Sequence, residues 1–318
     1  MLDRDCSNIL RCLAIFSVIC AHVSTADKDT TNLLVSSLGS IGVGLFFLLS
    51  GYLYYSNRKD VKIFTISRIK NIIIPWLFCG TLDWLYVVLR KGGIGISGWF
   101  DSVFIHSHYY FLTVLMMLFY LLRSVRYNKS ILKLLIVISL VSCFMTSKGM
   151  ISFIYPYINP LNWFFYFVIG LLMANYNCID IFISISRKIL FLSIPLSIYV
   201  LLWYIYDGRL ISYWGNGNVL FITLLIICQF GIVTYINKNS FLWKILAFIG
   251  KISFSIYLIH MPFAGITSKA IEIIDVPQLR LIAPFIVLIV VVLLIEGIRY
   301  VSRKLKSEIL IKYILGIR

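Results

Sequence analysis

Two ionisable side chains lie at the ends of the first apolar run, in the stretch RCLAIFSVICAH. Arg11 is a fixed cation, and His22 is an imidazole that binds and releases a proton near neutral pH. Eleven steps along an α-helix give three turns plus about 20° and a rise of about 16 Å, so both side chains share one stripe. Ionisable residues inside a membrane helix are functional candidates. The alternative is an interfacial anchor at Arg11 and a polar cap at His22.

Two later segments carry further histidines. Ser253, Tyr257 and His260 follow i, i+4, i+7 spacing, which places them on one face of a helix. His106 and His108 precede another apolar run, but residues at i and i+2 do not share a helical face. No Cys or acidic residue completes a metal set beside them, so we expect no metal site.

Polar groups also interrupt the second and third apolar runs. Ser50, followed by Gly51, can form a hydrogen bond across helices while the glycine allows close packing. Asp83 lies inside the third run, where a charge costs at least about 3 kcal/mol, so we expect it to be paired, protonated or exposed to water. Arg68 and Lys70 belong to a basic loop that suits anionic lipid headgroups or a phosphorylated ligand.

The composition shows which solvent surrounds these residues. The chain has 318 residues, of which 60% are hydrophobic and 13% charged, and a mean hydropathy of +0.94. These values indicate a polytopic membrane protein. The net charge of +16 then reflects basic loops facing the cytoplasm and membrane lipid, and we expect no nucleic-acid partner. The seven cysteines occur singly and imply no disulfide framework.

About ten apolar runs approach the ~20 residues that a membrane helix needs. They cover residues 8–24, 33–56, 71–90, 108–123, 131–147, 160–176, 188–206, 217–236, 243–264 and 280–300. The connections between them are short. We therefore expect an all-α, polytopic membrane helix bundle that forms a single domain over residues 1–318, with no appended soluble domain.

The distribution of Lys and Arg orients these runs. With a cytoplasmic N-terminus, every inner segment holds at least two cations, including Arg58 and Lys59 in the loop after the second run. Of the 29 Lys and Arg residues, the outer segments hold only Lys28, Arg90, Lys91, Lys148, Arg209, Lys269 and Arg280. This bias predicts ten spans with both termini in the cytoplasm.

Five stretches, in order, resemble motifs of the acyltransferase-3 family of integral-membrane acyltransferases. LRCLAIFSVICAH is similar to the family's Arg-(ten residues)-His signature, and GLFFLLSGYL to its Phe-Phe-x-x-Ser-Gly motif. The later stretches SRIKNIIIP, HYYFLTVLMMLFYLL and FSIYLIHMPF also resemble family motifs. Asn8, Asn71 and Tyr110 depart from the pattern, and Asn71 replaces a common second arginine.

The resemblance implies an O-acyltransferase of the bacterial inner membrane. Members commonly acetylate surface polysaccharides, so the expected reaction moves an acyl group, usually acetyl, from cytoplasmic acyl-CoA to a hydroxyl of a polysaccharide or lipid-linked glycan precursor such as O-antigen. Acyl-CoA is the co-substrate, and no tightly bound cofactor is expected. The implied catalytic residues are His22, as general base, and Arg11.

Other roles follow from the same resemblance. Arg11, Arg68 and Lys70 would bind the CoA phosphates through charge-assisted hydrogen bonds. An acyl-His intermediate is a variant of the mechanism. The second candidates, for acceptor binding or for orienting His22, are Ser50, Asp83, His108, Ser253, Tyr257 and His260.

Three alternatives remain. A transporter or glycan flippase would also have a polar interior, although the sequence shows no inverted repeat and no pair of broken helices. A glycan polymerase usually has a long outer loop, and the longest outer connection here, roughly 91–107, is short. An acyltransferase of this family can also act on a small soluble acceptor.

Overall fold

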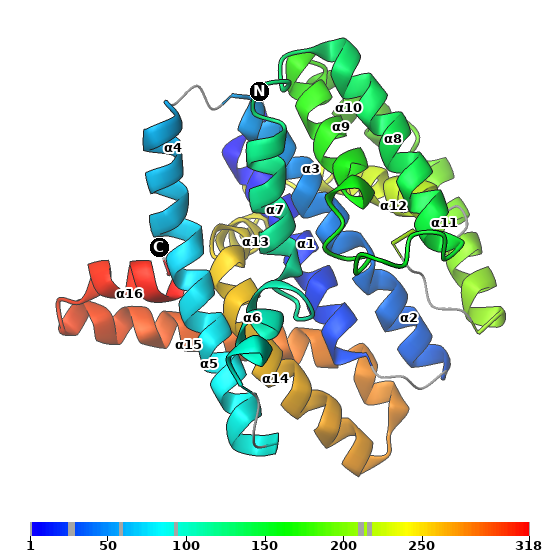
Figure 1. Cartoon of the computed structure of the whole chain (residues 1–318). Helices are drawn as coiled ribbons and strands as arrows, with labels where there is room; N and C mark the ends of the chain where they lie inside the picture. The colour runs from blue at the N-terminus through cyan, green and yellow to red at the C-terminus, as the bar shows by residue number, and fades with distance from the viewer. Residues whose placement is uncertain are drawn as a thin grey trace.

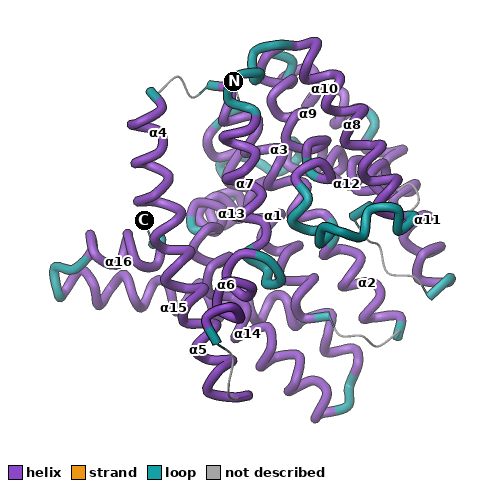
Figure 2. Tube along the Cα trace, in the orientation of Figure 1, coloured by secondary structure: helices purple, strands orange, loops and turns teal. Residues whose placement is uncertain are grey.

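All regular elements of the described chain are helices (Figures 1 and 2). The computed structural model describes residues 2–24, 29–56, 60–91, 95–208, 213–214 and 218–317. The α-helices are α1 (Arg4–Val23), α2 (Thr30–Gly39), α3 (Ile41–Tyr55), α4 (Val61–Arg68), α5 (Ile74–Lys91), α6 (Ile96–Phe104), α7 (Tyr110–Leu121), α8 (Lys129–Ser147), α9 (Phe164–Asn175), α10 (Ile179–Lys188), α11 (Leu190–Tyr206), α12 (Asn218–Val233), α13 (Phe241–Lys251), α14 (Ser253–Ile274), α15 (Ala283–Lys304) and α16 (Glu308–Leu315). The π-helix η1 (Ile69–Ile73) joins α4 to α5, and η2 (Pro160–Asn162) and η3 (Pro277–Leu281) are short 3-10 helices. The predicted all-α fold is confirmed.

Each of the ten predicted apolar runs overlaps a helix. Five segments are long and apolar enough to cross a membrane: Arg4–Val23, Thr30–Tyr55, Val61–Leu89, Lys129–Ser147 and Ala283–Lys304. If each of two bent pairs, α9 with α10 at 113° and α13 with α14 at 79°, forms one span, the number is seven. Helices α7, α11 and α12 are shorter apolar helices. The described chain is therefore a polytopic membrane helix bundle, and the count of ten spans stays a prediction.

Helix α1 is the centre of the bundle, where Figure 1 shows it flanked by α2 and α14. It packs against α2, α3, α12, α13, α14 and α15. One side of α1 is fixed by Ser17, whose hydroxyl donates to the Leu38 carbonyl at 2.6 Å and accepts from the backbone N–H of Gly42 at 2.8 Å. This polar contact joins α1 to the break between α2 and α3.

Helices α3 and α9 cross at backbone-to-backbone distance. A Cβ atom on Gly51 would lie 2.0 Å from the carbonyl oxygen of Phe167, and one on Gly170 would lie 2.0 Å from that of Leu48. Because no larger residue fits either position, the two glycines set the separation of the helices. The packing role that the sequence predicts for Gly51 is confirmed.

The π-helix η1 lies beside Pro75, which has no backbone N–H to donate and whose ring crowds the carbonyl four residues earlier. The N–H of Ile74 donates instead to the carbonyl of Ile69, five residues back. Arg68 and Asn71 line the same cavity, described below, while Lys70 is exposed. The π-helix thus divides the basic segment into a side that faces the bundle and a side that does not.

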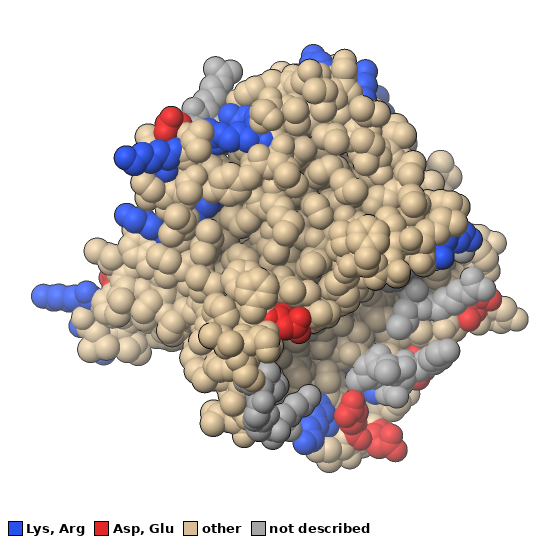
Figure 3. Space-filling model, viewed as in Figure 1, with Lys and Arg blue, Asp and Glu red and all other residues tan. Residues whose placement is uncertain are grey.

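One end of the bundle gathers segments that the charge pattern assigns to the cytoplasm. The side-chain amide of Asn175 donates to the Tyr127 carbonyl at 3.2 Å, and Lys238 pairs with Asp3 at 3.6 Å. Figure 3 shows many Lys and Arg side chains over this end, where Figure 1 places the N-terminus. The predicted cations Lys28, Arg58, Lys59, Arg209 and Arg318 lie outside the described residues.

The opposite end is tied together by Asp29, the N-cap of α2. Its carboxylate accepts from Arg280 at 3.1 Å and from the backbone N–H of Asn32 at 3.0 Å. Partial desolvation by itself would raise the pKa of Asp29, but the hydrogen bonds from Thr31 and Asn32 and the charge of Arg280 lower it below its ordinary value. The Asp29–Arg280 contact joins two segments that the charge pattern assigns to the outer side, and the alternation of all ten spans stays a prediction.

Candidate active site

Three of the four histidines meet inside the bundle, and we call them the three-histidine cluster. His22 comes from the end of α1, His108 from the connection before α7, and His260 from α14. The ring centroid of His22 lies 5.9 Å from that of His108 and 5.2 Å from that of His260, and the last two are 5.3 Å apart. His22 therefore faces the interior of the bundle, toward two other imidazoles.

Hydrogen bonds define the state of the cluster. Nδ1 of His260 is 2.8 Å from the carbonyl oxygen of Tyr257, and because a carbonyl only accepts, Nδ1 carries the hydrogen. The Tyr257 hydroxyl donates to the backbone carbonyl of His108. The Nε2 atoms of His108 and His260 are buried and form no hydrogen bond with the described residues. In a neutral His260 ring, Nε2 is thus the nitrogen that can accept a proton.

The cluster does not have the arrangement of a metal centre. Within the described ranges, no group of three or more His, Cys, Asp or Glu side chains could hold a metal ion. Imidazoles can bind and release a proton near neutral pH, so the three histidines are candidate proton-transfer groups.

A cavity of about 370 Å³, which we call the Arg11 cavity, lies on one side of the cluster. It is lined by three cations and by no acidic residue. Its lining is Arg11, Arg68, Lys251, Asn71, Ser50, Ser253, Ser255, Tyr54, Tyr257, Phe46, Leu53, Ile72, Phe111, Leu112, Leu115, Phe119, Phe254 and Gly316. Cations together with aliphatic and aromatic side chains suit a ligand that has phosphates at one end and an uncharged chain at the other.

The arginines of this cavity are held by their neighbours. The Nη1 atom of Arg11 donates to the Asn8 side-chain oxygen at 3.4 Å. The Arg68 guanidinium lies 4.7 Å from the ring centroid of Phe64 and 4.8 Å from that of Phe119. Cation–π contacts of this kind orient the guanidinium plane. Lys70, predicted as a third phosphate ligand, does not line the cavity, whereas Lys251, which the sequence analysis did not select, does.

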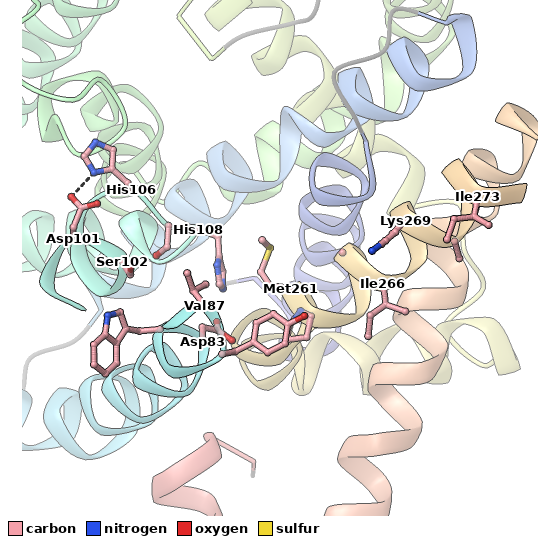
Figure 4. A pocket seen from close by; sticks show the side chains of 16 residues that line it. Asp83, Val87, Asp101, Ser102, His106, His108, Met261, Ile266, Lys269 and Ile273 are labelled. Atoms are coloured by element: carbon pink, nitrogen blue, oxygen red, sulfur yellow. Dashed lines mark hydrogen bonds and ion pairs between the residues drawn. The ribbon is translucent and has the colours of Figure 1, made fainter. Parts of the chain in front are cut away.

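A second cavity of about 640 Å³, which we call the Asp83 cavity, lies between α5, α6 and α14 (Figure 4). The Asp83 carboxylate accepts a hydrogen bond from the Tyr109 hydroxyl at 2.7 Å. Figure 4 shows Asp101 and His106 paired on one side, at 2.5 Å, and Lys269 on the other. The lining also includes Trp84, Tyr86, His108, Met261, Ile266 and Ile273. Tyr109 is therefore the partner that the sequence led us to expect for Asp83, and the Asp83 carboxylate borders the cavity.

The two cavities are separated by a wall that contains His108 and Tyr257, whereas His22 and His260 line neither cavity. His108 lines the Asp83 cavity, Tyr257 lines the Arg11 cavity, and the hydrogen bond between them joins the two walls. Of the other predicted residues, Ser50 and Ser253 lie in the Arg11 cavity. The sequence analysis missed Tyr109 and Trp84, because an aromatic residue in an apolar run carries no signal that separates a cavity wall from packing.

Comparison with known proteins places this arrangement in a family. A family model described as an acyltransferase domain, that of acyltransferase-3, matches residues 4–297, which include both cavities except Gly316. No curated protein and no solved structure matches the chain. The chain thus belongs to the acyltransferase-3 family of membrane acyltransferases.

Proposed function

We propose that the protein transfers an acyl group, usually acetyl, from cytoplasmic acyl-CoA to a hydroxyl of a glycan, with His22 as general base. One observation carries the proposal: a cation-lined cavity and a larger cavity lie on the two sides of the wall that Tyr257 and His108 form, and the ring of His108 lies beside those of His22 and His260. A transfer between two different substrates needs one site for each and a proton-transfer group where they meet.

The Arg11 cavity is the proposed donor site. Arg11, Arg68 and Lys251 supply charge for the phosphates of CoA, and the apolar lining, which includes Phe111 and Leu115, suits its uncharged arm. Arg11 and His22 are separated by about 16 Å along α1. This length allows the phosphates to bind near Arg11 while the thioester reaches the histidines.

At the cluster, a ring nitrogen of His22 takes the proton from the acceptor hydroxyl while the hydroxyl oxygen attacks the thioester carbonyl carbon. The carbon–sulfur bond then breaks, the ester forms, and the histidinium returns its proton to the CoA sulfur. General acid–base catalysis of this kind contributes about 10²- to 10⁴-fold in rate. The rings of His108 and His260 lie beside that of His22, with centroids 5.9 and 5.2 Å away, and are the proposed groups that orient it.

The Asp83 cavity is the proposed acceptor site. Asp83, Asp101, His106 and Lys269 supply hydrogen-bonding groups for a saccharide, and Trp84 supplies an aromatic face. The cavity also borders exposed apolar side chains of α14, including Ile266 and Ile273. This border favours a lipid-linked glycan precursor over a small soluble acceptor. The proposed location is the bacterial inner membrane, with both termini of the protein in the cytoplasm.

Membranes that contain the protein, incubated with radiolabelled acetyl-CoA, test the proposal. We expect label in the lipid-linked glycan fraction, and a loss of at least about a hundredfold for His22→Gln at equal protein level. For comparison, His106→Gln is expected to raise the KM for the acceptor while leaving that for acetyl-CoA unchanged. Full transfer by His22→Gln would refute the general-base assignment, and label in a small soluble product would refute the glycan acceptor.

A further inference from the structure

A group of arginines and aromatic rings lies against the wall of the Arg11 cavity. The rings of Tyr54, Phe64 and Phe119 contact one another, with centroids 4.9 to 5.6 Å apart. Tyr54 and Phe119 both line the cavity. Because α3 ends at Tyr55, Tyr54 marks the end of the cavity on the cation-rich side of the bundle, away from the three-histidine cluster.

Three guanidinium groups surround these rings. Arg68 lies over Phe64 and Phe119, as described above. Arg123 lies 5.6 Å from the centroid of Phe64, and Arg126 lies 4.9 Å from that of Tyr54. The last two follow α7 and were not selected from the sequence except as cytoplasmic cations. We call the three arginines and three rings the arginine–aromatic cluster.

Arg126 is the most buried of the three arginines. Arg126 is 6% exposed, and its Nε and Nη1 atoms are buried without a hydrogen-bond partner among the described residues. The guanidinium donates a hydrogen bond to the Tyr54 side chain and lies 4.9 Å from the ring centroid of Tyr54 and 4.7 Å from that of Tyr127, and these contacts offset part of the cost of removing a cation from water. Arg126 does not line the Arg11 cavity itself but contacts Tyr54, which does. An anion bound at this end of the cavity would compensate the buried charge further.

We propose that Arg126, with Arg123 and Arg68 beside it, binds the phosphate monoester on the ribose of CoA. The inference rests on the proposed function and adds the part of the donor that the cluster recognises. A monoester carries a charge of about −1.5 to −2 near pH 7 and presents three oxygens, which match the planar fork of a guanidinium. The ribose phosphate is also remote from the thioester, as the cluster is remote from the histidines.

An anionic lipid headgroup offers the same phosphate chemistry. Headgroups bind cations that are exposed at the membrane surface, such as Lys70 and Arg187. Arg126 instead is buried, and its ring partner Tyr54 borders the internal cavity. The position of Arg126 therefore favours the soluble donor.

The test compares acetyl-CoA with 3′-dephospho-acetyl-CoA as donors. For the wild type, we expect removal of the phosphate to lower kcat/KM about tenfold to a hundredfold. Arg126→Gln should lose as much with acetyl-CoA and nothing further with the dephospho donor, and Arg126→Lys should fall between. Arg187→Gln is the matched control, because Arg187 is exposed, lies 5.1 Å from the Tyr235 ring centroid and borders neither cavity.

Equal use of both donors by the wild type would overturn the inference while leaving the proposed function intact. An Arg126→Gln variant that kept the donor preference of the wild type would overturn it as well. Transfer from neither thioester would refute the proposed function itself. If both Arg126 variants fail to fold, as judged by size-exclusion chromatography, the wild-type donor comparison still decides.

A second pair of assays separates the two phosphate sources. The wild type and Arg126→Gln are reconstituted in phosphatidylcholine vesicles with and without phosphatidylglycerol. We expect the loss in Arg126→Gln to be the same in both and confined to acetyl-CoA. A loss that requires phosphatidylglycerol and is equal for both donors would show a lipid ligand and overturn the inference.

Discussion

Replacement of Tyr257 by Phe removes one hydroxyl from the boundary between the two cavities. This hydroxyl donates to the backbone carbonyl of His108, and the residue is 4% exposed. Phe fills the same space beside Phe111 and His108, whose ring centroids lie 5.6 and 5.4 Å away. The substitution therefore deletes a hydrogen bond while keeping the packing.

The loss leaves a buried carbonyl without its donor, which costs about 1–3 kcal/mol. When His108 is displaced in the transition state and the activation free energy rises by this amount, kcat falls about 5- to 150-fold, because 1.36 kcal/mol corresponds to a factor of ten. The KM for acetyl-CoA should change little, since Arg11 and Arg68 are untouched.

Initial rates of acetyl transfer at varied acetyl-CoA concentration measure both constants, with protein level and thermal stability recorded on the same membranes. A higher KM at unchanged kcat would refute the reasoning, because Tyr257 would then act by lining the donor cavity. An unchanged kcat and KM would refute any role of the hydrogen bond in catalysis.

Tyr166→Phe is a matched control. Tyr166 is 2% exposed, its hydroxyl forms no hydrogen bond with the described residues, and it borders neither cavity. Removal of a buried hydroxyl that lacks a partner should leave kcat unchanged and stability equal or higher. A loss of activity as large as that of Tyr257→Phe would mean that any buried hydroxyl of the bundle affects the rate.

Two further predictions concern stability. Asp29→Asn should lower the free energy of unfolding by about 1–3 kcal/mol at pH 7, because it weakens the contact with Arg280. Since folding lowers the pKa of Asp29, the carboxylate contributes its full stabilisation at a pH above its ordinary pKa, and this contribution is lost as the pH falls through the lowered pKa. Thermal unfolding from pH 7 to 3 checks this, and a gap between variant and wild type that does not narrow with acid would contradict it. Gly51→Ala should destabilise the α3–α9 contact by about 1–3 kcal/mol, because its Cβ would lie 2.0 Å from the Phe167 oxygen. Gly297→Ala, where nothing lies within 4 Å of the added Cβ, should instead stabilise by about 0.5–1 kcal/mol, and the two midpoints measured by thermal shift must therefore move in opposite directions.

Hydropathy was sufficient to predict the all-α class and a helix in each of the ten apolar runs, but it did not predict the short helices α4, α6 and α16. In lipid, every buried backbone group must find a partner within its own helix, so a long apolar run leaves little choice of secondary structure. The bends were not predictable in the same way. The 79° turn between α13 and α14 occurs at Ile252, a residue without helix-breaking chemistry, and reflects the packing of both helices against α1.

The candidate site was predicted in its parts but not in its assembly. Helical spacing placed Arg11 and His22 on one stripe, and the structure turns that stripe inward. Spacing along one helix could not show that His108, in a connection, would lie beside His22 and His260. Lys70 was selected because a cation next to Arg68 resembles a phosphate ligand, but the helical turn directs it away from the cavity.

The central position of α1 also has a consequence for biogenesis. His22 meets His260 only after most of the chain has been made, and α1 packs against helices as late as α15. At about 5–20 residues per second, His22 remains for about 10–50 s without His260 beside it, whereas the partners of Ser17, Leu38 and Gly42, follow directly in the chain. A chain that stops before α14 therefore cannot form the three-histidine cluster, because its His22 lacks the ring of His260 beside it.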